Sequence, residues 1–178
     1  MTSFMLKVIA LITMTIDHFS ILVLEDFSGI LRVIGRIAFP IFAFQLVEGY
    51  VHTSNKYKHF MLLLIFGIIS QIPFGMAFYP YLADKSLNIF FTLLLGFMAM
   101  YCYDSFKLWL STKKSNFIKK HSHIFSIVAM IPFIILSELF HVDYGYWGVL
   151  VICVFYLFRD CKKTLLLPLA YLIICIIK

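Results

Sequence analysis

Four long apolar runs constrain the fold of this chain more than any other feature of its sequence. They cover residues 4–24, 30–51, 60–79 and 87–110. A helix needs roughly 20 mostly apolar residues to cross the hydrocarbon core of a bilayer, and each run has that length. Because that core offers no water to exposed backbone groups, such segments are expected to be complete helices. The sequence therefore predicts an all-α integral membrane protein.

Three further apolar runs raise the expected number of membrane-spanning helices to about seven. Residues 124–140 are long enough, whereas residues 146–158 and 165–177 are short and need flanking residues or a locally thinner bilayer. With 62% hydrophobic residues in a chain of 178, a water-soluble globule of this size could not bury the apolar side chains. The runs are evenly spread, so we predict one multi-pass domain over residues 1–178 in the cell membrane.

Basic residues are unevenly shared between the two sets of loops that join these runs. One set holds ten, namely Lys56, Lys58, Lys107, Lys113, Lys114, Lys119, Lys120, Arg159, Lys162 and Lys163, and the other holds Arg32, Lys85 and Lys178. Loops rich in lysine and arginine stay in the cytoplasm, which predicts a cytoplasmic amino terminus and, with seven spans, an external carboxyl terminus. The net charge of +6 follows from this bias, so we expect no nucleic-acid partner.

Several other classes of protein find no support in the sequence. The four cysteines have no C-x-x-C spacing and lie in or beside apolar runs, so we expect neither a disulfide framework nor a metal site. There is no H-E-x-x-H, G-x-S-x-G or Walker A string. The first run holds Asp17 and His18 and lacks a small-residue cleavage site, so we expect it to remain as a span.

Ionisable side chains inside the predicted spans need an explanation, because each costs about 2.5 to 3.5 kcal/mol near the middle of a bilayer. Asp17 lies about 20 Å from the inner end of its helix and Arg36 about 9 Å from the outer end of the next, and in a core about 30 Å thick these depths coincide. An Asp17–Arg36 pair that only fixes helix packing is one interpretation. It leaves His18, Glu48 and His52 unexplained, and their number favours a polar cavity with a function.

The second run also carries a proline among its polar residues. Gln45, Glu48 and His52 share one helix face, whereas Arg36 points about 120° away from Glu48 in a straight helix. Pro40 cannot donate a hydrogen bond to the carbonyl of Arg36, which predicts a kink there that would turn the two polar sets toward each other.

Polar residues also mark both ends of the predicted bundle. At the outer side, Gln71 has a depth similar to Asp17, and Asn88 begins the fourth span, where a helix cap is favoured over a ligand. Asp143 and Tyr144 form a tight outer turn with Gly145. At the inner side, the loop after the second span carries four polar or basic residues, Thr53, Asn55, Lys56 and Lys58. Their positive charge either only retains the loop in the cytoplasm or also binds phosphates.

Several short strings stand in a fixed order along the chain: Asp17-His18, the segments 35–44, 48–53, 69–74 and 87–92, and Asp143-Tyr144-Gly145. In this order and spacing they resemble the TraX family, which is named for a conjugative-pilus protein that acetylates the amino terminus of pilin. The family is similar, more distantly, to larger multi-span acyltransferases that use coenzyme A thioesters. The resemblance implies a transferase with acetyl-CoA as co-substrate.

Acyl transfer needs a base and a group that stabilises the oxyanion, which suggests roles for the polar residues. We expect His18 to be the base, oriented by Asp17 or Glu48, while Arg36 either pairs with Asp17 or stabilises negative charge. His52 is the alternative base. The phosphates of acetyl-CoA would meet His52, Thr53, Asn55, Lys56 and Lys58, and the acceptor, a peptide amino terminus or a small molecule, would meet Gln71, Asn88, Asp143 and Tyr144.

Two other functions remain open at this point. The buried charges could form an ion or proton path in a small transporter or channel subunit. They could also hold a partner helix in an assembly factor. The sequence does not indicate an oligomeric state, and membrane lipid is the one partner that its composition requires.

Overall fold

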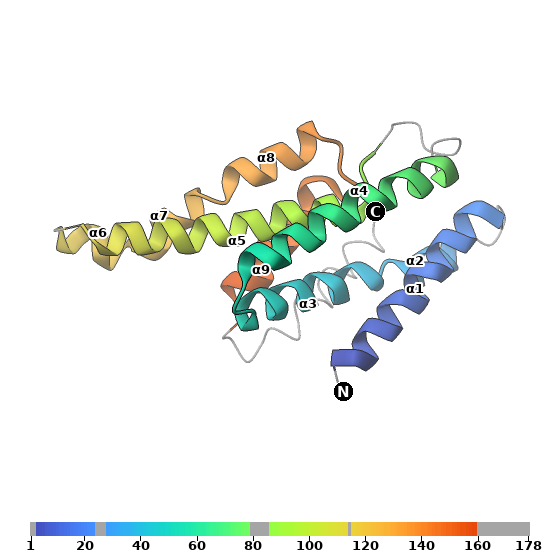
Figure 1. The fold of residues 1–178 in the computed structure, drawn as a ribbon, viewed down its shortest axis with the longest axis horizontal. Helices are drawn as coiled ribbons and strands as arrows, with labels where there is room; N and C mark the ends of the chain where they lie inside the picture. Colours follow the sequence, from blue (N-terminus) through green and yellow to red (C-terminus); the bar gives the residue numbers. More distant parts are fainter. Residues whose placement is uncertain (1–2, 24–27, 79–85, 114, 160–178) are drawn as a thin grey trace.

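A computed structural model describes residues 3–23, 28–78, 86–113 and 115–159 of the chain. Helices dominate this part of the protein (Figure 1). In chain order they are α1 (Ser3–Val23), α2 (Ser28–Gly35), α3 (Ala38–His52), α4 (Lys56–Phe78), α5 (Ile89–Ser111), α6 (Asn116–Lys120), α7 (Ser122–Val128), α8 (Ile131–Leu139) and α9 (Gly145–Leu157). The predicted all-α class is confirmed.

In the part of the chain that the structure describes, five helical stretches are long and apolar enough to cross a membrane, and each coincides with one of the first five predicted spans. They are Phe4–Leu22, Val33–His52, Lys56–Phe78, Ile89–Ser111 and Ser122–Leu139. The sixth predicted span corresponds to a shorter apolar helix, α9. The seventh, residues 165–177, lies outside the described residues. The cytoplasmic amino terminus stays a prediction.

The second span is interrupted, although not at the predicted position. Helix α2 ends at Gly35, a turn follows at Arg36 and Ile37, and α3 begins at Ala38. Pro40 therefore lies in the first turn of α3 rather than at a bend within a continuous helix. A proline is tolerated there because the first turn of a helix has no internal acceptor for its backbone N–H groups.

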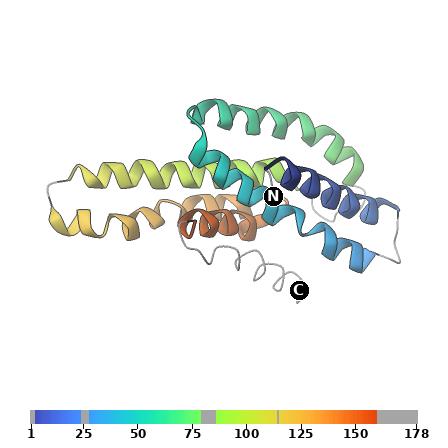
Figure 2. The same cartoon turned by 90° about the horizontal axis from the view of Figure 1, so that it is seen from below.

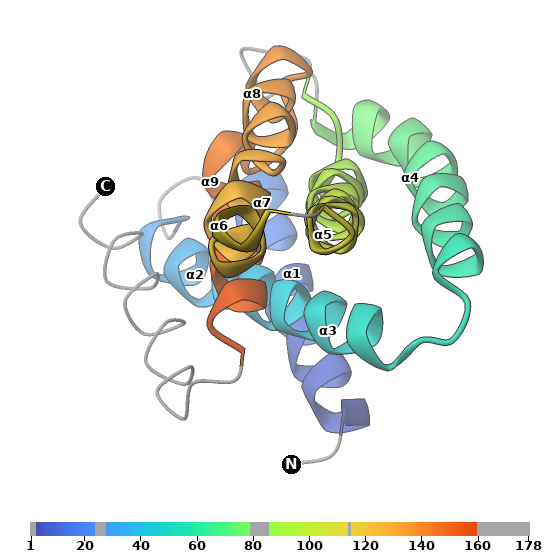
Figure 3. The same ribbon diagram turned by 90° about the vertical axis from the view of Figure 1, so that its left-hand side faces the viewer.

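Helix α5 occupies the centre of the bundle, with α4 on one side, α3 beneath it and α8 and α9 on the other side (Figure 3). Buried side chains of α3, α5 and α9 form the largest apolar core, which includes Phe39, Tyr50, Phe97, Met100 and Ile152. Helix α1 packs against α2 and α3 at the side of this core (Figure 2). The amino-terminal helices and the α4–α5 pair thus form two walls that face each other.

Small residues allow the central helices to approach closely. A Cβ atom at Gly96 of α5 would lie 2.5 Å from Cδ1 of Ile152 on α9. A Cβ at Gly148 of α9 would lie 2.5 Å from Cγ2 of Thr92 on α5. Because the two glycines lie on opposite helices, each helix contributes one gap that a side chain of the other helix fills. Close backbone approach of this kind is a common source of packing energy between membrane helices.

We predict that Gly96→Ala destabilises the protein and that Gly67→Ala does not. Relieving an overlap in a packed core costs about 1–3 kcal/mol, whereas a Cβ at Gly67 comes no nearer than 3.4 Å to another atom, the Cβ of Phe90. The better helix propensity of alanine acts at both positions and cancels in the comparison. Thermal unfolding in detergent should show a lower midpoint for Gly96→Ala alone. Equal midpoints would mean that α5 and α9 are packed less tightly than described.

Candidate functional site

A pocket of about 310 Å³ lies between α1, α4, the start of α5 and the turn before α9. Four polar residues line it, namely His18, Ser70, Asn88 and Asp143, and the remaining lining residues are apolar. A half-enclosed apolar cavity with a few convergent polar groups is typical of a binding or catalytic site. We call this cavity the outer pocket, because its walls come from the half of the bundle that is predicted to lie outside.

His18 and Asp17 leave α1 in different directions. The ring of His18 lines the outer pocket and meets Phe78 edge to face, with 4.8 Å between ring centroids. Asp17 instead packs on Gly35, where an added Cβ would overlap the Asp17 side chain. A glycine at this position thus allows the carboxyl group to lie against the end of α2, next to the turn that contains Arg36.

Asn88 and Gln71 build the wall of the outer pocket through hydrogen bonds. Asn88 caps α5, since its Oδ1 accepts the Phe90 N–H at 3.0 Å, as the sequence favoured. Its Nδ2 donates to the Gly67 carbonyl at 2.9 Å and to Ser70 Oγ at 3.0 Å. Gln71 Oε1 accepts the Asn88 backbone N–H at 2.9 Å, and its Nε2 donates to the Ser86 carbonyl at 3.2 Å. Both amides therefore tie α4 to the start of α5.

Asp143 is held at the pocket by a short backbone bridge. Its N–H donates to the Leu87 carbonyl at 2.8 Å, and the Leu87 N–H donates to the His141 carbonyl at 2.9 Å. The carboxyl group lies deep among protein atoms but opens into the pocket. Burial, and secondly the negative charge of Asp17, raise the pKa of Asp143 to about 6. Asp143 can therefore take up or release a proton close to neutral pH.

Tyr144 follows Asp143 but is not among the residues that line the pocket. Its ring stacks on Phe39 of α3, with 4.0 Å between centroids and 19° between ring planes. Stacking of this kind fixes the orientation of the turn relative to α3. The side chain that was expected to meet the acceptor thus contributes to packing.

The two other predicted catalytic residues lie at the far end of α3. Glu48 and His52 are 13 and 17 residues beyond Gly35, so Glu48 is about 20 Å from the Asp17 contact. His52 Nδ1 lies 2.9 Å from the Glu48 carbonyl and 3.7 Å from Glu48 Oε2, and its side chain is 73% exposed. The structure does not bring this pair to His18. The predicted set is divided between two ends of the bundle.

The predicted phosphate-binding residues lie beside this pair, where α3 turns into α4. The Thr53 N–H donates to the Gly49 carbonyl at 3.0 Å, and Asn55 Oδ1 accepts the Lys58 N–H at 2.9 Å. Lys56 Nζ lies 3.4 Å from Oδ2 of Asp104 on α5. The segment is thus a capped, ordered turn with Lys58 exposed at its surface.

Sequence reasoning missed a cluster centred on Asp104. Tyr50 of α3 donates to its Oδ2 at 2.7 Å, and Tyr156 of α9 donates to its Oδ1 at 2.5 Å. Lys56 completes the cluster, and its Nζ atom lies 4.0 Å from the centre of the Tyr50 ring. The sequence did offer one signal for this cluster, because Asp104 is a carboxylate within the apolar run of residues 87–110. The cluster joins the inner ends of four helices.

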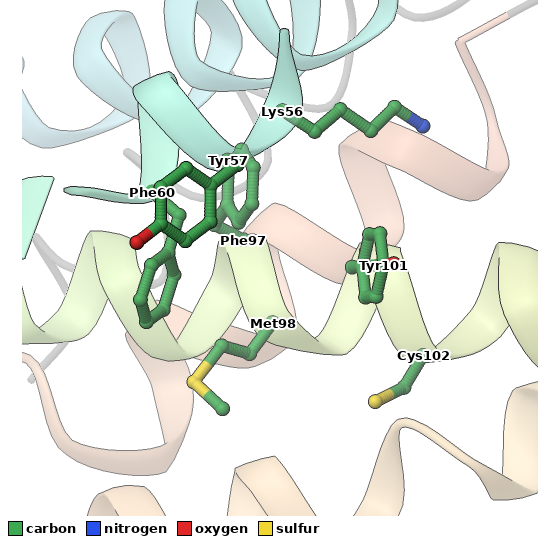
Figure 4. Close-up of a pocket in the computed structure, with 7 residues that line it drawn as sticks. All are labelled: Lys56, Tyr57, Phe60, Phe97, Met98, Tyr101 and Cys102. Carbon is green, nitrogen blue, oxygen red and sulfur yellow. The ribbon is translucent and has the colours of Figure 1, made fainter. Parts of the chain in front are cut away.

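A second pocket, of about 350 Å³, lies next to the Asp104 cluster between α4 and α5 (Figure 4). Its lining is mainly apolar and aromatic: Lys56, Tyr57, Phe60, Phe97, Met98, Tyr101 and Cys102. We call it the inner pocket. Within the described residues, no group of three histidine, cysteine or acidic side chains is arranged to hold a metal ion.

Comparison with known proteins assigns the chain to a family. The family model described as TraX protein matches residues 3–178. The chain belongs to the TraX family. A probable fimbrial assembly protein FimC, serogroup H1, of Dichelobacter nodosus is 39% identical over 111 residues, which is 56% of this chain and 45% of that protein. An uncharacterized protein of Rickettsia prowazekii (strain Madrid E) is 38% identical over 93 residues, 52% of this chain and 34% of that protein.

The chain spans less than half of the length of either of these relatives in the matched regions. No solved structure matches it. The family and the apolar helices together suggest a membrane protein, and the name of the first relative refers to fimbrial assembly.

We predict that Asp143→Asn stabilises the folded protein above about pH 6 and that this gain disappears on acidification. With its pKa raised from 3.8 to about 6, Asp143 binds a proton more tightly in the folded state than in the unfolded chain. Its ionisation therefore opposes folding at high pH, and this cost vanishes as the pH falls toward 4. Thermal unfolding of both proteins at about pH 8 and about pH 4 checks the prediction.

Glu138→Gln serves as the matched control, because Glu138 is an exposed carboxylate on the neighbouring helix α8. It should change the midpoint little at either pH. A difference between Asp143→Asn and the parent protein that is the same at both pH values would contradict the raised pKa of Asp143.

Proposed function

We propose that this chain is a multi-pass acyltransferase of the cell membrane that moves an acetyl group from acetyl-CoA to an amine or hydroxyl acceptor. The observation that carries the proposal is the convergence of His18 and Asp143 on one pocket, beside the Asp17 contact at Gly35. A histidine and a carboxylate that line the same mainly apolar cavity suit general-base chemistry. Membership of the TraX family and the relative named for fimbrial assembly support a transferase that modifies a pilin-like acceptor.

In this proposal, His18 is the general base of the outer pocket. The acceptor nitrogen or oxygen attacks the thioester carbonyl carbon, and His18 removes the acceptor proton as the new bond forms. The tetrahedral intermediate then expels the coenzyme A thiolate, which takes up a proton to leave as the free thiol. Arg36, in the turn beside Asp17, stabilises the oxyanion or holds Asp17 in place. Asp143 attracts an acceptor amine through its negative charge.

The donor approaches from the other end of the bundle. The phosphates of acetyl-CoA meet the turn of Thr53, Asn55, Lys56 and Lys58, with His52 beside it. Backbone N–H groups, lysines and an exposed histidine suit phosphate oxygens. The inner pocket lies at this turn and shares Lys56 with it. This arrangement places the acceptor and the coenzyme A phosphates at opposite ends of the molecule, so the acetyl end of the donor has to extend from the turn to the outer pocket.

We predict that the purified protein binds acetyl-CoA in detergent and that Arg36→Ala weakens the binding at least tenfold. The reason is that, in this proposal, the guanidinium either stabilises negative charge on the thioester or holds Asp17 in place against α2. Isothermal titration calorimetry measures the affinity directly. Lys113→Ala is the control, because Lys113 packs over the Trp109 ring at the tip of α5, remote from the outer pocket.

Equal affinities for Arg36→Ala and Lys113→Ala would remove Arg36 from the site. No binding at all by well-folded protein would reject the transferase and favour the transporter. Reconstituted protein should then support substrate-dependent flux across liposomes.

We further predict that His18→Ala lowers the slow hydrolysis of acetyl-CoA by at least about 100-fold, the usual contribution of a general base. His52→Ala should raise the concentration of acetyl-CoA needed for half-maximal rate and leave the maximal rate nearly unchanged. Release of the free thiol is followed colorimetrically after equal membrane expression has been confirmed. The reverse pattern would make His52 the base. Full activity of both variants would exclude histidine base catalysis at either position.

A further inference from the structure

The inner pocket combines flat aromatic walls with a positive charge at its rim. Tyr57 and Phe60 come from the first turns of α4, and Phe97 and Tyr101 come from the middle of α5 (Figure 4). Tyr57 and Tyr101 are 71% and 51% exposed, whereas Phe97 is 2% exposed and lies at the base of the pocket. Among the described residues that line the pocket, Lys56 alone is charged. The pocket therefore offers ring faces to a flat molecule and a cation beside them.

Ring contacts hold the base of the pocket in place. The Phe97 ring meets the rings of Tyr50 and His59 edge to face, with 5.1 Å between centroids in each case. The centroid of the Phe60 ring lies 6.3 Å from that of Phe97. Aromatic pairs at these separations stabilise packing. The shape of the pocket is thus set by the packing of α3, α4 and α5 before any ligand binds.

The Asp104 cluster holds Lys56 at the rim through a long contact. Lys56 Nζ lies 3.4 Å from Asp104 Oδ2, and both side chains are 36% exposed. The hydroxyl groups of Tyr50 and Tyr156 lie closer to the carboxylate, at 2.7 Å and 2.5 Å. Because a carboxylate accepts several hydrogen bonds, Asp104 keeps two short ones when Lys56 turns to another anion. The ammonium group is therefore positioned beside the pocket and can be transferred to a ligand.

The position of the pocket limits what can bind in it. Lys56 and Tyr57 are the first two residues of α4, the turn before them carries Thr53 and Asn55, and Lys58 is exposed beside them. The pocket thus lies at the end of a span, next to a polar turn. A ligand needs a flat apolar group for the rings and negative charge for the lysines. Phosphate groups pair with lysine, and a purine base stacks on aromatic rings.

We propose that the inner pocket is a purine nucleotide site, in which the base lies against the rings of Tyr57 and Tyr101 and a phosphate takes Lys56 from Asp104. The identity of the nucleotide rests on the proposed function, under which it is the 3′-phosphoadenosine end of acetyl-CoA. A phospholipid also combines phosphate with apolar groups. The exposed tyrosine rings of two helices favour the nucleotide, because a flat heterocycle stacks on a ring face and a flexible chain does not.

The site is tested with adenosine 3′,5′-bisphosphate, which has no thioester and so binds whether or not transfer occurs. In a protein with Trp109→Phe and Trp147→Phe, Tyr101→Trp introduces a single tryptophan whose fluorescence a stacked purine quenches. We expect saturable quenching in phosphatidylcholine nanodiscs, and none when Tyr146→Trp at the start of α9 carries the tryptophan instead. Tyr57→Leu should weaken the binding at least about tenfold. No quenching of well-folded protein, or equal quenching at both positions, would overturn the nucleotide site.

Asp104 gives a second test, because removing its charge should strengthen the binding. Asp104→Asn still offers hydrogen bonds to the two tyrosines but no longer attracts Lys56. We expect a several-fold higher affinity for the bisphosphate, whereas Glu138→Gln, at an exposed carboxylate of α8, should leave it unchanged. Lys56→Gln should lower the affinity at least about tenfold, which keeps the assignment testable if Asp104→Asn does not fold. Unchanged or lower affinity of folded Asp104→Asn, or unchanged affinity of Lys56→Gln, would overturn the phosphate contact.

Other outcomes separate this proposal from the transferase function. Binding of the bisphosphate without any turnover of acetyl-CoA would reject the transferase and leave the nucleotide site intact. Hydrolysis of acetyl-CoA that the bisphosphate does not inhibit would support the transferase and overturn the inner pocket as its nucleotide site. Quenching of Tyr101→Trp by brominated phosphatidylcholine that the bisphosphate does not relieve would show that lipid fills the pocket, and would also overturn the nucleotide.

Discussion

The outer site depends on the close approach of α1 to the end of α2. A charged side chain in the hydrocarbon region is stable only when other polar groups surround it. The Asp17 carboxyl group packs on Gly35, which has no side chain and so leaves room for it beside the helix break at Arg36 and Ile37. Since Asp17 turns toward α2, its neighbour His18 is directed to the pocket. The glycine and the helix break thus accompany a packed Asp17 carboxyl group and a His18 ring that lines the pocket.

A different arrangement holds the inner end of the bundle. Asp104 accepts hydrogen bonds from Tyr50 and Tyr156 and lies near Lys56, so one carboxylate joins α3, α4, α5 and α9. A carboxylate can accept several hydrogen bonds, whereas each neighbouring helix offers only a few donors at this point, so the partners come from several helices. At the outer end, α4 and the start of α5 are joined by hydrogen bonds of two uncharged amide side chains, Asn88 and Gln71. The pocket therefore keeps Asp143 and His18 available for chemistry, since amides carry the structural bonds.

The sequence predicted features that depend on nearby residues in the chain, such as helical spans and caps. It missed contacts between residues that are far apart in the chain. Span positions followed from run length, and the Asn88 cap followed from its place ahead of an apolar run. A kink was expected at Pro40, whereas the helix is interrupted at Arg36 and Ile37 and Pro40 lies in the first turn of α3, where its missing N–H costs no helical hydrogen bond. The partners of Asp104 could not be foreseen, since Tyr50 and Tyr156 are 54 and 52 residues away along the chain.

The division of the predicted catalytic set gives a physical reason to place chemistry in the outer pocket. Periodicity grouped Glu48 with His52 correctly on one helix. Residue counting along that helix already places Glu48 about 20 Å from the contact of Asp17 with Gly35, a separation that the predicted catalytic set did not take into account. At His52, whose side chain is 73% exposed, water would compete with any acceptor for the thioester. At His18, apolar side chains of α1 and α4 line the cavity beside the imidazole ring. A transferase must exclude water from its acyl donor, and under the proposed function this condition favours the pocket at His18 over the exposed His52.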